Sequence, residues 1–280
     1  MNAVQRLSAF GVVLAGIFAI GIGAGATLGP TASTTTTMAP APIGEGVVAT
    51  ADGYRFVPAT RQLAEDGGMF RFVVEGPNGQ PVLDFEQEHE KDLHFILVNR
   101  ELTVFHHLHP TREAAGTWSI DLPALPAGSY RAVADFHVAH GPRLALGTDL
   151  SVAGDYTPTT LAEPATTSMV DGFEIAMQSE VHAGGEVKIA LTVRKDGHVI
   201  TDLQPYLGAF GHLVAMRSGD LAYAHVHPDD YVDGTVRFDA ELSSEARYGL
   251  FLDFKYGDAV HTATFTFDQG LVTAAPTMGH

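Results

Sequence analysis

The sequence predicts an all-β protein, in which two tandem β-sandwich domains of the immunoglobulin or cupredoxin type follow an N-terminal hydrophobic helix. The first observation is a series of short segments rich in Val, Phe, Tyr and Thr, several of which alternate apolar and polar residues as half-buried strands do. The second is their density, because about seven short strands per ~100 residues is typical of such a sandwich. The third is an internal repeat, which gives two domains of similar size.

The repeat is clearest around the histidines. The first half holds DLHFILV followed by FHHLHP, and the second holds HLVAM followed by YAHVHP. One constant shift, the 118 positions from His94 to His212, aligns these segments without gaps and extends beyond them. Further aligned pairs are Gly79 with Gly197, Val82 with Ile200, Tyr130 with Tyr248, and Asp135-Phe136 with Asp253-Phe254. An ungapped match of this kind indicates a tandem duplication.

Length and composition limit the possible functions. A chain of 280 residues fits about two domains, and 45% hydrophobic residues is enough for each half to bury a core. The formal net charge of −17 argues against nucleic acid or anionic lipid as a partner and is compatible with attracting cations. The chain has no cysteine, which excludes disulfides, thiolate metal sites, thiol nucleophiles and a lipoprotein-type anchor.

Residues 1–30 predict an export signal. Arg6 is their only charged side chain, and the uncharged run that follows has about the ~20 residues needed to span a bilayer as a helix, which favours an uncleaved signal anchor. A cleaved signal peptide is the alternative, with Ala24-Gly25-Ala26 as its cleavage site. Both place the folded domains outside the membrane, as a single-pass or a secreted protein, because no Lys or Arg follows until Arg55.

Changes in composition divide the rest of the chain. Residues 31–47 are rich in Thr, Ala and Pro and predict an extended tether. Residues 155–168 have a similar composition and predict a linker between the halves. The remaining expected ranges are 48–154 for the first repeat, 169–270 for the second and 271–280 for a tail.

Each half contains the strand segments that a sandwich needs. In the first half they are residues 70–74, 93–98, 117–122, 130–136 and 145–152. In the second half they are residues 173–177, 187–193, 212–216, 236–242, 248–254 and 262–267. Between two of the latter, Lys195-Asp196-Gly197 is typical of a tight hairpin turn.

Hairpin geometry predicts how the first-half histidines meet. A two-residue loop at Arg100-Glu101 would place His94 directly opposite His107, with His109 one pleat along on the same face. Opposed Cβ atoms lie ~5 Å apart and diagonal ones ~7–8 Å. Imidazoles that bind one ion at ~2.0–2.1 Å can bridge such gaps.

The second half predicts the same arrangement. A loop at Ser218-Gly219 would place His212 opposite His225, with His227 beside them. Each half therefore predicts three imidazoles on one face of a sheet.

An aspartate is the fourth polar residue that the repeat keeps. Asp135 and Asp253 stand in apolar strands, where a carboxylate could bind a metal directly or accept the distal N–H of a metal-binding histidine. The predicted metal sites are His94, His107, His109 and Asp135 in the first half, and His212, His225, His227 and Asp253 in the second.

Nitrogen and oxygen donors without sulfur suit zinc, copper(II) or nickel and disfavour copper(I), so copper or zinc is the expected cofactor. The alternative is a structural or interaction module, in which the histidines and aspartates form hydrogen-bonded clasps without an ion.

The two copies differ in their other histidines. The first half has four additional histidines, His89, His106, His137 and His140. The second half has none at the aligned positions but has His261. His106 alternates to the opposite sheet face from His107, and the last two of the four are predicted to lie in a loop as auxiliary ligands. These differences predict that the two sites are not equivalent.

Catalytic motifs are absent from the sequence. There is no G-x-S-x-G elbow, P-loop or G-x-G-x-x-G, so an enzyme is not expected. The expected partners are a metal ion and, through the N-terminal helix, a membrane.

The segments KDLHFILVNRELTVFHHLHP and YLGAFGHLVAMRSGDLAYAHVHP resemble those of a family of exported actinobacterial proteins with a duplicated HLxxxR…HxHP pattern. The resemblance covers roughly residues 48–270. Such proteins are described as secreted or heavy-metal-associated, and they are similar to small copper-handling β-sandwich proteins of the periplasm. The resemblance implies an anchored extracytoplasmic metal-binding protein. The first copy departs from this pattern, because it has Asn99 where the second has Arg217, Arg100 one place later, and an additional His106.

Overall fold

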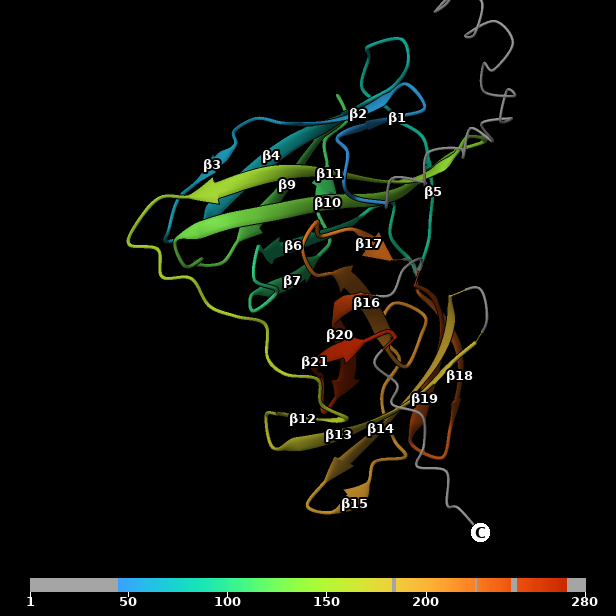
Figure 1. Cartoon of the computed structure of the whole chain (residues 1–280). Helices are drawn as coiled ribbons and strands as arrows, with labels where there is room; N and C mark the ends of the chain where they lie inside the picture. The colour runs from blue at the N-terminus through green and yellow to red at the C-terminus, as the bar shows by residue number, and fades with distance from the viewer. Residues whose placement is uncertain (1–44, 183–184, 225, 243–245, 271–280) are drawn as a thin grey trace, which may run out of the picture. The chain divides into compact units, whose positions relative to one another are not determined.

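The computed structural model describes residues 45–182, 185–224, 226–242 and 246–270 (Figure 1). Every regular element in these ranges is a β-strand, which confirms the predicted all-β class. Within the same ranges no helix is long and apolar enough to cross a membrane. The predicted N-terminal helix, the tether up to residue 44 and the tail at 271–280 lie outside the described residues.

The first repeat is a sandwich of two sheets. One sheet contains, in order, β1 (Thr50–Ala51), β2 (Tyr54–Pro58), β4 (Gly68–Glu75), β9 (Thr117–Leu122) and β8 (Thr111–Arg112). The other contains β3 (Gln62–Leu63), β11 (Arg143–Val152), β10 (Gly128–Val138), β6 (His94–Asn99) and β7 (Phe105–Leu108), and β5 (Phe85–Glu86) pairs with β10. Aromatic rings from both sheets fill the space between them, and Phe72 of β4 stacks on Phe95 of β6 with ring centroids 5.6 Å apart.

The second repeat has the same two layers. One sheet contains β12 (Thr167–Val170), β13 (Phe173–Val181), β14 (Glu186–Lys195), β19 (Thr235–Glu241) and β18 (Val226–Val232), and β15 (His198–Val199) pairs with β14. The other contains β17 (Tyr223–Ala224), β16 (His212–Arg217), β20 (Arg247–Tyr256) and β21 (Ala259–Asp268). Its core is a separate cluster of buried side chains from both sheets.

The strand segments expected from the sequence all fall on strands. The segment TWSIDL coincides with β9, and the predicted turn after Lys195 is a two-residue hairpin that pairs Lys195 with His198. Asp196 and Gly197 have φ angles of 51° and 79°, as a type I′ turn requires. Pro228 lies within β18, where a proline without an N–H is tolerated because β18 is an edge strand.

A third apolar cluster joins the repeats, which belong to one compact unit. It uses aligned positions from both: Ile96 and Val214, Val98 and Met216, Val133 and Phe251, and Phe105 and Tyr223. The rings of Phe105 and Phe251 stack with centroids 4.1 Å apart and planes inclined by 4°. The contact is therefore self-complementary, like the interface of a twofold dimer.

This contact explains the unbroken apolar run in the first histidine segment. All six residues of β6 are buried, because Phe95 and Leu97 point into the core of the first repeat and Ile96 and Val98 point at the second. His94 has the same parity as Ile96, so its side chain is on the face that meets the other repeat.

A short segment before β1 binds both repeats. The backbone N–H of Gly46 donates to Ala145 at 2.8 Å, and that of Tyr223, in the second repeat, donates to Glu45 at 2.8 Å. Arg131 donates to the carbonyl of Gly46 at 2.9 Å. Glu45 and Gly46, which precede the expected boundary at Val48, are therefore part of the folded unit.

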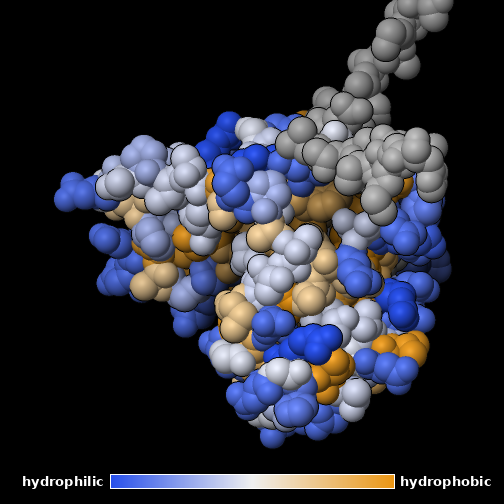
Figure 2. Space-filling view, turned by 60° about the horizontal axis from the view of Figure 1, so that its bottom comes forward, coloured by the Kyte–Doolittle hydropathy of each residue, from blue (hydrophilic) through white to orange (hydrophobic). Residues whose placement is uncertain are grey.

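Figure 2 shows hydrophilic residues over much of one face, with smaller apolar groups between them. The large apolar side chains that are exposed in the described ranges come from separate strands and loops, such as Met169, Tyr156 and Val260. The apolar residues are thus used mainly inside the two sandwiches and between them.

We expect Gly147→Ala to lower the free energy of unfolding by about 1–3 kcal/mol, because overpacking at a close backbone contact forces the chain to shift. A Cβ at Gly147 would lie 1.6 Å from the carbonyl oxygen of Gly46. Urea denaturation measures the effect, and Gly76→Ala is the matched control because its nearest contact is an ordinary 3.5 Å. Equal midpoints for the two variants would contradict this close approach.

Candidate metal centre

The hairpin that carries the first-half histidines has a longer loop than expected. Ile96 pairs with His107 and Phe95 with Leu108, so the five residues 100–104 connect β6 and β7 where a two-residue loop was expected. The side chain of Asn99 causes this, because its Oδ1 accepts the backbone N–H groups of Thr103 at 2.8 Å and Val104 at 2.9 Å. The expected pairing of His94 opposite His107 is therefore wrong by two residues.

The second hairpin shows the same shift. Ala215 pairs with Ala224, whereas the expected loop at Ser218-Gly219 would have placed His212 opposite His225. Asp220 organises this loop by accepting from Arg217 Nε at 2.9 Å and from the backbone N–H of Ala222 at 3.2 Å. A shift of two residues keeps every side chain on the same face of the sheet, so the expected face holds although the partners change.

Three first-half histidines come together at the end of this hairpin. His94 Nδ1 lies 2.9 Å from His107 Nε2 and 3.2 Å from His109 Nε2. One nitrogen from each ring lies within 4.8 Å of the other two. Among the described residues this is the group of His and carboxylate side chains that could hold a metal ion.

The outer nitrogens of two of these rings face groups that can only accept a hydrogen bond. His94 Nε2 lies 3.0 Å from the carbonyl oxygen of Glu88, and His107 Nδ1 lies 3.0 Å from Asp253 Oδ2. Each outer nitrogen therefore carries a proton, which in the neutral rings leaves a lone pair on His94 Nδ1 and on His107 Nε2. A hydrogen bond between these two nitrogens, 2.9 Å apart, needs a second proton on one of the rings, whereas a metal cation can accept both lone pairs. This is the arrangement in which outer partners orient metal-binding imidazoles.

Burial favours the neutral form of His94 and His109. It lowers the pKa of His94 from 6.5 to about 4, and electrostatic repulsion from the neighbouring imidazole of His107 adds to this effect. The same two causes lower the pKa of His109 to about 2. Neutral imidazole is the form that binds a metal, so these rings need not lose a proton at neutral pH.

His212 repeats part of this arrangement in the second half. Its Nε2 donates to the carbonyl oxygen of Tyr206 at 2.7 Å, and Tyr206 is the residue aligned with Glu88. Burial lowers the pKa of His212 to about 4. Its ring centroid lies 4.9 Å from that of His89 and 6.1 Å from that of His107, both in the first repeat.

The other two histidines predicted for the second site are not available for comparison. His225 lies outside the described residues, and His227 is described only by its backbone, which pairs with Asp239 in β18 and β19. The structure therefore brings His212 next to the first-half cluster, where the sequence had placed it in a separate site.

The two aspartates do not contact the histidine side chains of their own repeats in any described hydrogen bond. Asp253 accepts from His107 in the other repeat, and Thr262 Oγ1 donates to its second oxygen at 2.6 Å. Asp135 accepts the hydroxyl of Tyr223 at 2.8 Å and lies 3.6 Å from Arg143 Nη2. Burial, and then the charge of Asp135, raises the pKa of Tyr223 well above 10, so this hydroxyl keeps its proton.

A small cavity of about 40 Å³ lies at the contact between the repeats. Its lining combines His89, His94, His107 and Asp135 of the first repeat with His212 and Tyr223 of the second. This volume is enough for a water molecule. Since polar side chains from both repeats face it, the candidate centre belongs to the interface rather than to one sandwich.

Sequence reasoning missed several residues of this region. Tyr223 and Thr262 were not considered, and His89 was noted without a role. The signal for Tyr223 was its alignment with Phe105, which places a hydroxyl where the first repeat has none. His137 was expected in a loop but lies within β10, where its Nδ1 is 3.3 Å from Glu86 Oε2.

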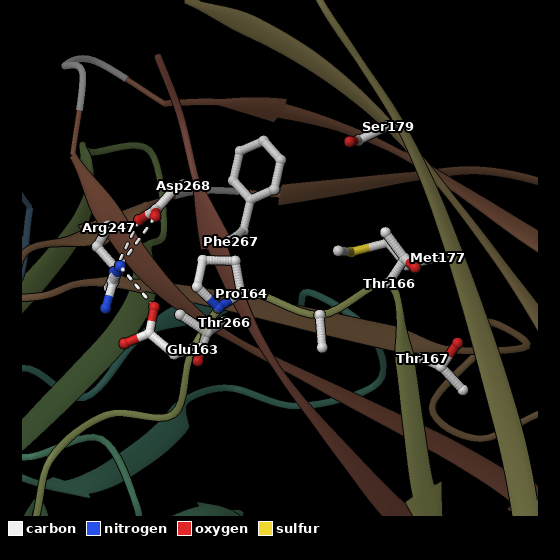
Figure 3. Close-up of a pocket in the computed structure, with 11 residues that line it drawn as sticks. Glu163, Pro164, Thr166, Thr167, Met177, Ser179, Arg247, Thr266, Phe267 and Asp268 are labelled. Atoms are coloured by element: carbon white, nitrogen blue, oxygen red, sulfur yellow. Dashed lines mark hydrogen bonds and ion pairs between the residues drawn. The ribbon is translucent and has the colours of Figure 1, made fainter. Parts of the chain in front are cut away.

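The larger pocket in Figure 3, about 730 Å³, lies elsewhere in the second repeat. Residues from β12, β13 and β21 and the segment before β12 line it. Arg247 of β20 also lines this pocket, and its guanidinium pairs with Asp268 and Glu163. No histidine lines this pocket, so it does not share the chemistry of the interface cavity.

Comparisons with known proteins leave the function open. Residues 167–270, the second repeat, match a family described as Domain of unknown function (DUF8832). A comparison with curated proteins gave no match.

The similar solved structures have low sequence identity to this chain. The N-terminal Ig1-2 module of the Drosophila receptor protein tyrosine phosphatase DLAR is 10% identical, with 77% of this chain and 97% of that chain covered and a TM-score of 0.21. InvD of Yersinia pseudotuberculosis is 15% identical, with 81% and 62% covered and a TM-score of 0.26. The protein's own sheets, two layers in each repeat, define it as a tandem β-sandwich protein.

The metal-free protein should lose stability in mild acid. His94 and His212 bind fewer protons folded than unfolded, so stability is full above pH 6.5 and falls as the pH drops toward about 4. The expected loss is on the order of 1–3 kcal/mol for each histidine. Urea midpoints measured with chelator between pH 7.5 and 4.5 test this, with His212→Gln expected to flatten the profile. A wild-type midpoint that stays constant over this range would contradict it.

Proposed function

We propose that the protein is an extracytoplasmic, membrane-tethered protein that binds a transition metal, copper or zinc, for buffering, delivery or resistance. The observation that carries this proposal is the convergence of the nitrogens of His94, His107 and His109. Two of these nitrogens are left with lone pairs because Glu88 and Asp253 accept the protons of the opposite ring positions. A metal cation can accept both lone pairs.

The distances are compatible with this proposal. Three nitrogens at 2.0–2.1 Å from one tetrahedral ion are about 3.3 Å apart. The separations of 2.9 and 3.2 Å from His94 need to open by only a few tenths of an ångström. A set of three imidazoles suits zinc or copper(II) better than copper(I), and it leaves a fourth position for an exchangeable ligand. Such an open position favours buffering or delivery over a purely structural ion.

A second site in the second repeat stays a prediction of the sequence. It would use His212 with His225, His227 and Asp253. The hydrogen bond from His212 Nε2 to Tyr206 supports it, because it repeats the bond that leaves a lone pair on His94 Nδ1. Two ions per chain are therefore the upper limit of this proposal.

The location outside the membrane is proposed from residues 1–47. The apolar run would serve as signal anchor or signal peptide, and the Thr/Pro-rich tether would join the folded part at Glu45. Nucleic acid is not proposed as a partner, because the net charge is −17. We expect no enzymatic activity, since the sequence holds no recognised catalytic motif.

A second candidate is the interaction module with a clasp between its repeats. The bonds from His107 to Asp253 and from Tyr223 to Asp135 favour it, because both join the repeats without any ion. In that case the histidines would stabilise the fold directly, and partners would bind elsewhere on the surface.

A zinc titration tests the metal proposal. We expect the full chain, purified without a histidine tag, to bind zinc with a Kd tighter than ~10 μM, and His107→Ala to weaken binding at least tenfold because one of three ligands is lost. His106→Ala is the matched control, since His106 is the next residue on β7 and points to the opposite face. Calorimetry gives both values. Binding weaker than ~10 μM, or equal binding in His107→Ala, would exclude this site.

Chelation distinguishes the two candidates. If the metal function holds, zinc at 100 times its Kd should stabilise the fold by about 2.7 kcal/mol and raise Tm, and chelator should reverse this. The clasp candidate expects no change in Tm with either addition. Differential scanning calorimetry with and without chelator measures the difference, and His107→Ala should remove the zinc effect only in the first case.

A further inference from the structure

We propose that the metal centre is shared between the two repeats, because Asp253 of the second repeat sets the tautomer of a metal ligand in the first. Cation binding and the packing of the repeats against each other are then one coupled equilibrium. This inference rests on the proposed metal function and adds to it a positioning residue and a means of regulation.

The contact that carries the inference is buried and directional. His107 Nδ1 lies 3.0 Å from Asp253 Oδ2, and the two side chains are only 4% and 6% exposed. The other carboxylate oxygen accepts the hydroxyl of Thr262 at 2.6 Å, and Thr262 is in register with Asp253 on the neighbouring strand. Both oxygens are thus engaged, one by the second repeat's own sheet and one by the first repeat.

This contact decides which nitrogen of His107 can bind a cation. A carboxylate only accepts, so Nδ1 carries the proton and Nε2 keeps its lone pair, directed at His94 Nδ1 2.9 Å away. An amide in place of the carboxylate would keep its oxygen on the Thr262 hydroxyl and turn its N–H₂ toward His107. The proton of His107 would then move to Nε2, where it blocks the cation.

The same two strands hold the apolar contact between the repeats. Phe105 and His107 point to one side of β7, and Phe251 and Asp253 point to one side of β20. Phe105 stacks on Phe251 at 4.1 Å, and two residues further along each strand His107 meets Asp253. Separating the repeats therefore removes the carboxylate from His107. By linkage, a cation that prefers the packed state strengthens the packing by the same factor.

The aligned aspartate of the first repeat, Asp135, has different partners from Asp253. Asp135 is also buried and also reaches the other repeat, but it accepts from Tyr223 and lies close to Arg143, not to a histidine. Its neighbour in register is Ala145, which has no hydroxyl. Asp135 and Asp253 are thus similar in burial and in position in the interface, and they differ in whether they hold a ligand.

The first experiment compares Asp253→Asn with Asp268→Asn in the full chain by zinc calorimetry and by the visible absorption of bound cobalt(II). Loss of an outer-shell partner of this kind weakens metal binding about 10–100-fold, which is the expectation for Asp253→Asn, together with an altered cobalt spectrum. Asp268→Asn should stay within about threefold, because Asp268 pairs with Arg247 in a pocket that no histidine lines. Thr262→Val should weaken binding and Thr262→Ser should restore it, which keeps the test open if Asp253→Asn fails to fold.

The second experiment loosens the interface without touching a polar group. Phe251→Ala should weaken zinc binding about tenfold if binding and packing are coupled at the strength usual for linked sites. Val260→Ala, an exposed residue on β21, should leave binding unchanged. Zinc affinity equal to wild type in Asp253→Asn and Thr262→Val overturns the positioning role, and equal affinity in Phe251→Ala overturns the coupling. If the wild-type chain itself binds no zinc, the proposed function fails first, and that outcome is distinct from these.

Discussion

The hydrogen bond between His107 and Asp253 is the interaction on which the candidate centre depends. It is 3.0 Å long and buried, and it joins two residues, one from each repeat, that are 146 positions apart in the sequence. Without the carboxylate, the N–H of His107 would be buried without an acceptor, and the ring would be free to take the other tautomer. With it, a lone pair of the neutral ring faces His94, which is the orientation that the proposed cation site requires.

This bond requires the two sandwiches to pack closely, and the duplication makes that possible. Because the same positions of both halves form the contact, each gene copy supplied a surface complementary to the other, as in a twofold dimer. This packing requires β6 to have apolar side chains on both faces, since one face packs in the core of the first repeat and the other against the second repeat. All six residues of β6 are accordingly buried. The polar residues on that interface face then lie at the end of the apolar contact, where His94 and His212 begin their strands.

The sequence alone was sufficient to predict the strands and the sheet face on which the histidines lie. It was not sufficient to predict which residues those histidines contact. Alternation and turn residues locate strands because they act locally, as at Asp196-Gly197. The predicted register of both hairpins was wrong because Asn99 and Asp220 stabilise loops longer than two residues. They do so through side-chain hydrogen bonds to the backbone, which the rules for tight turns do not include. The contact between Asp253 and His107 could not be predicted, because the residue pattern of a strand does not indicate which sheet of the other repeat its outer face will pack against.

The divergence of the copies follows from the same interface. In a twofold arrangement, each contact between the repeats has an equivalent with the roles of the repeats exchanged. Where the two aligned contacts differ, the repeats are no longer equivalent. Asp253 has the Thr262 hydroxyl beside it and holds a histidine, whereas Asp135 has Ala145 beside it and is held by Tyr223 and Arg143. The aligned carboxylates therefore have different partners, and only one of them is shown orienting an imidazole. A duplicated frame that keeps two aspartates but uses them differently can maintain the packing with one and tune a cation site with the other.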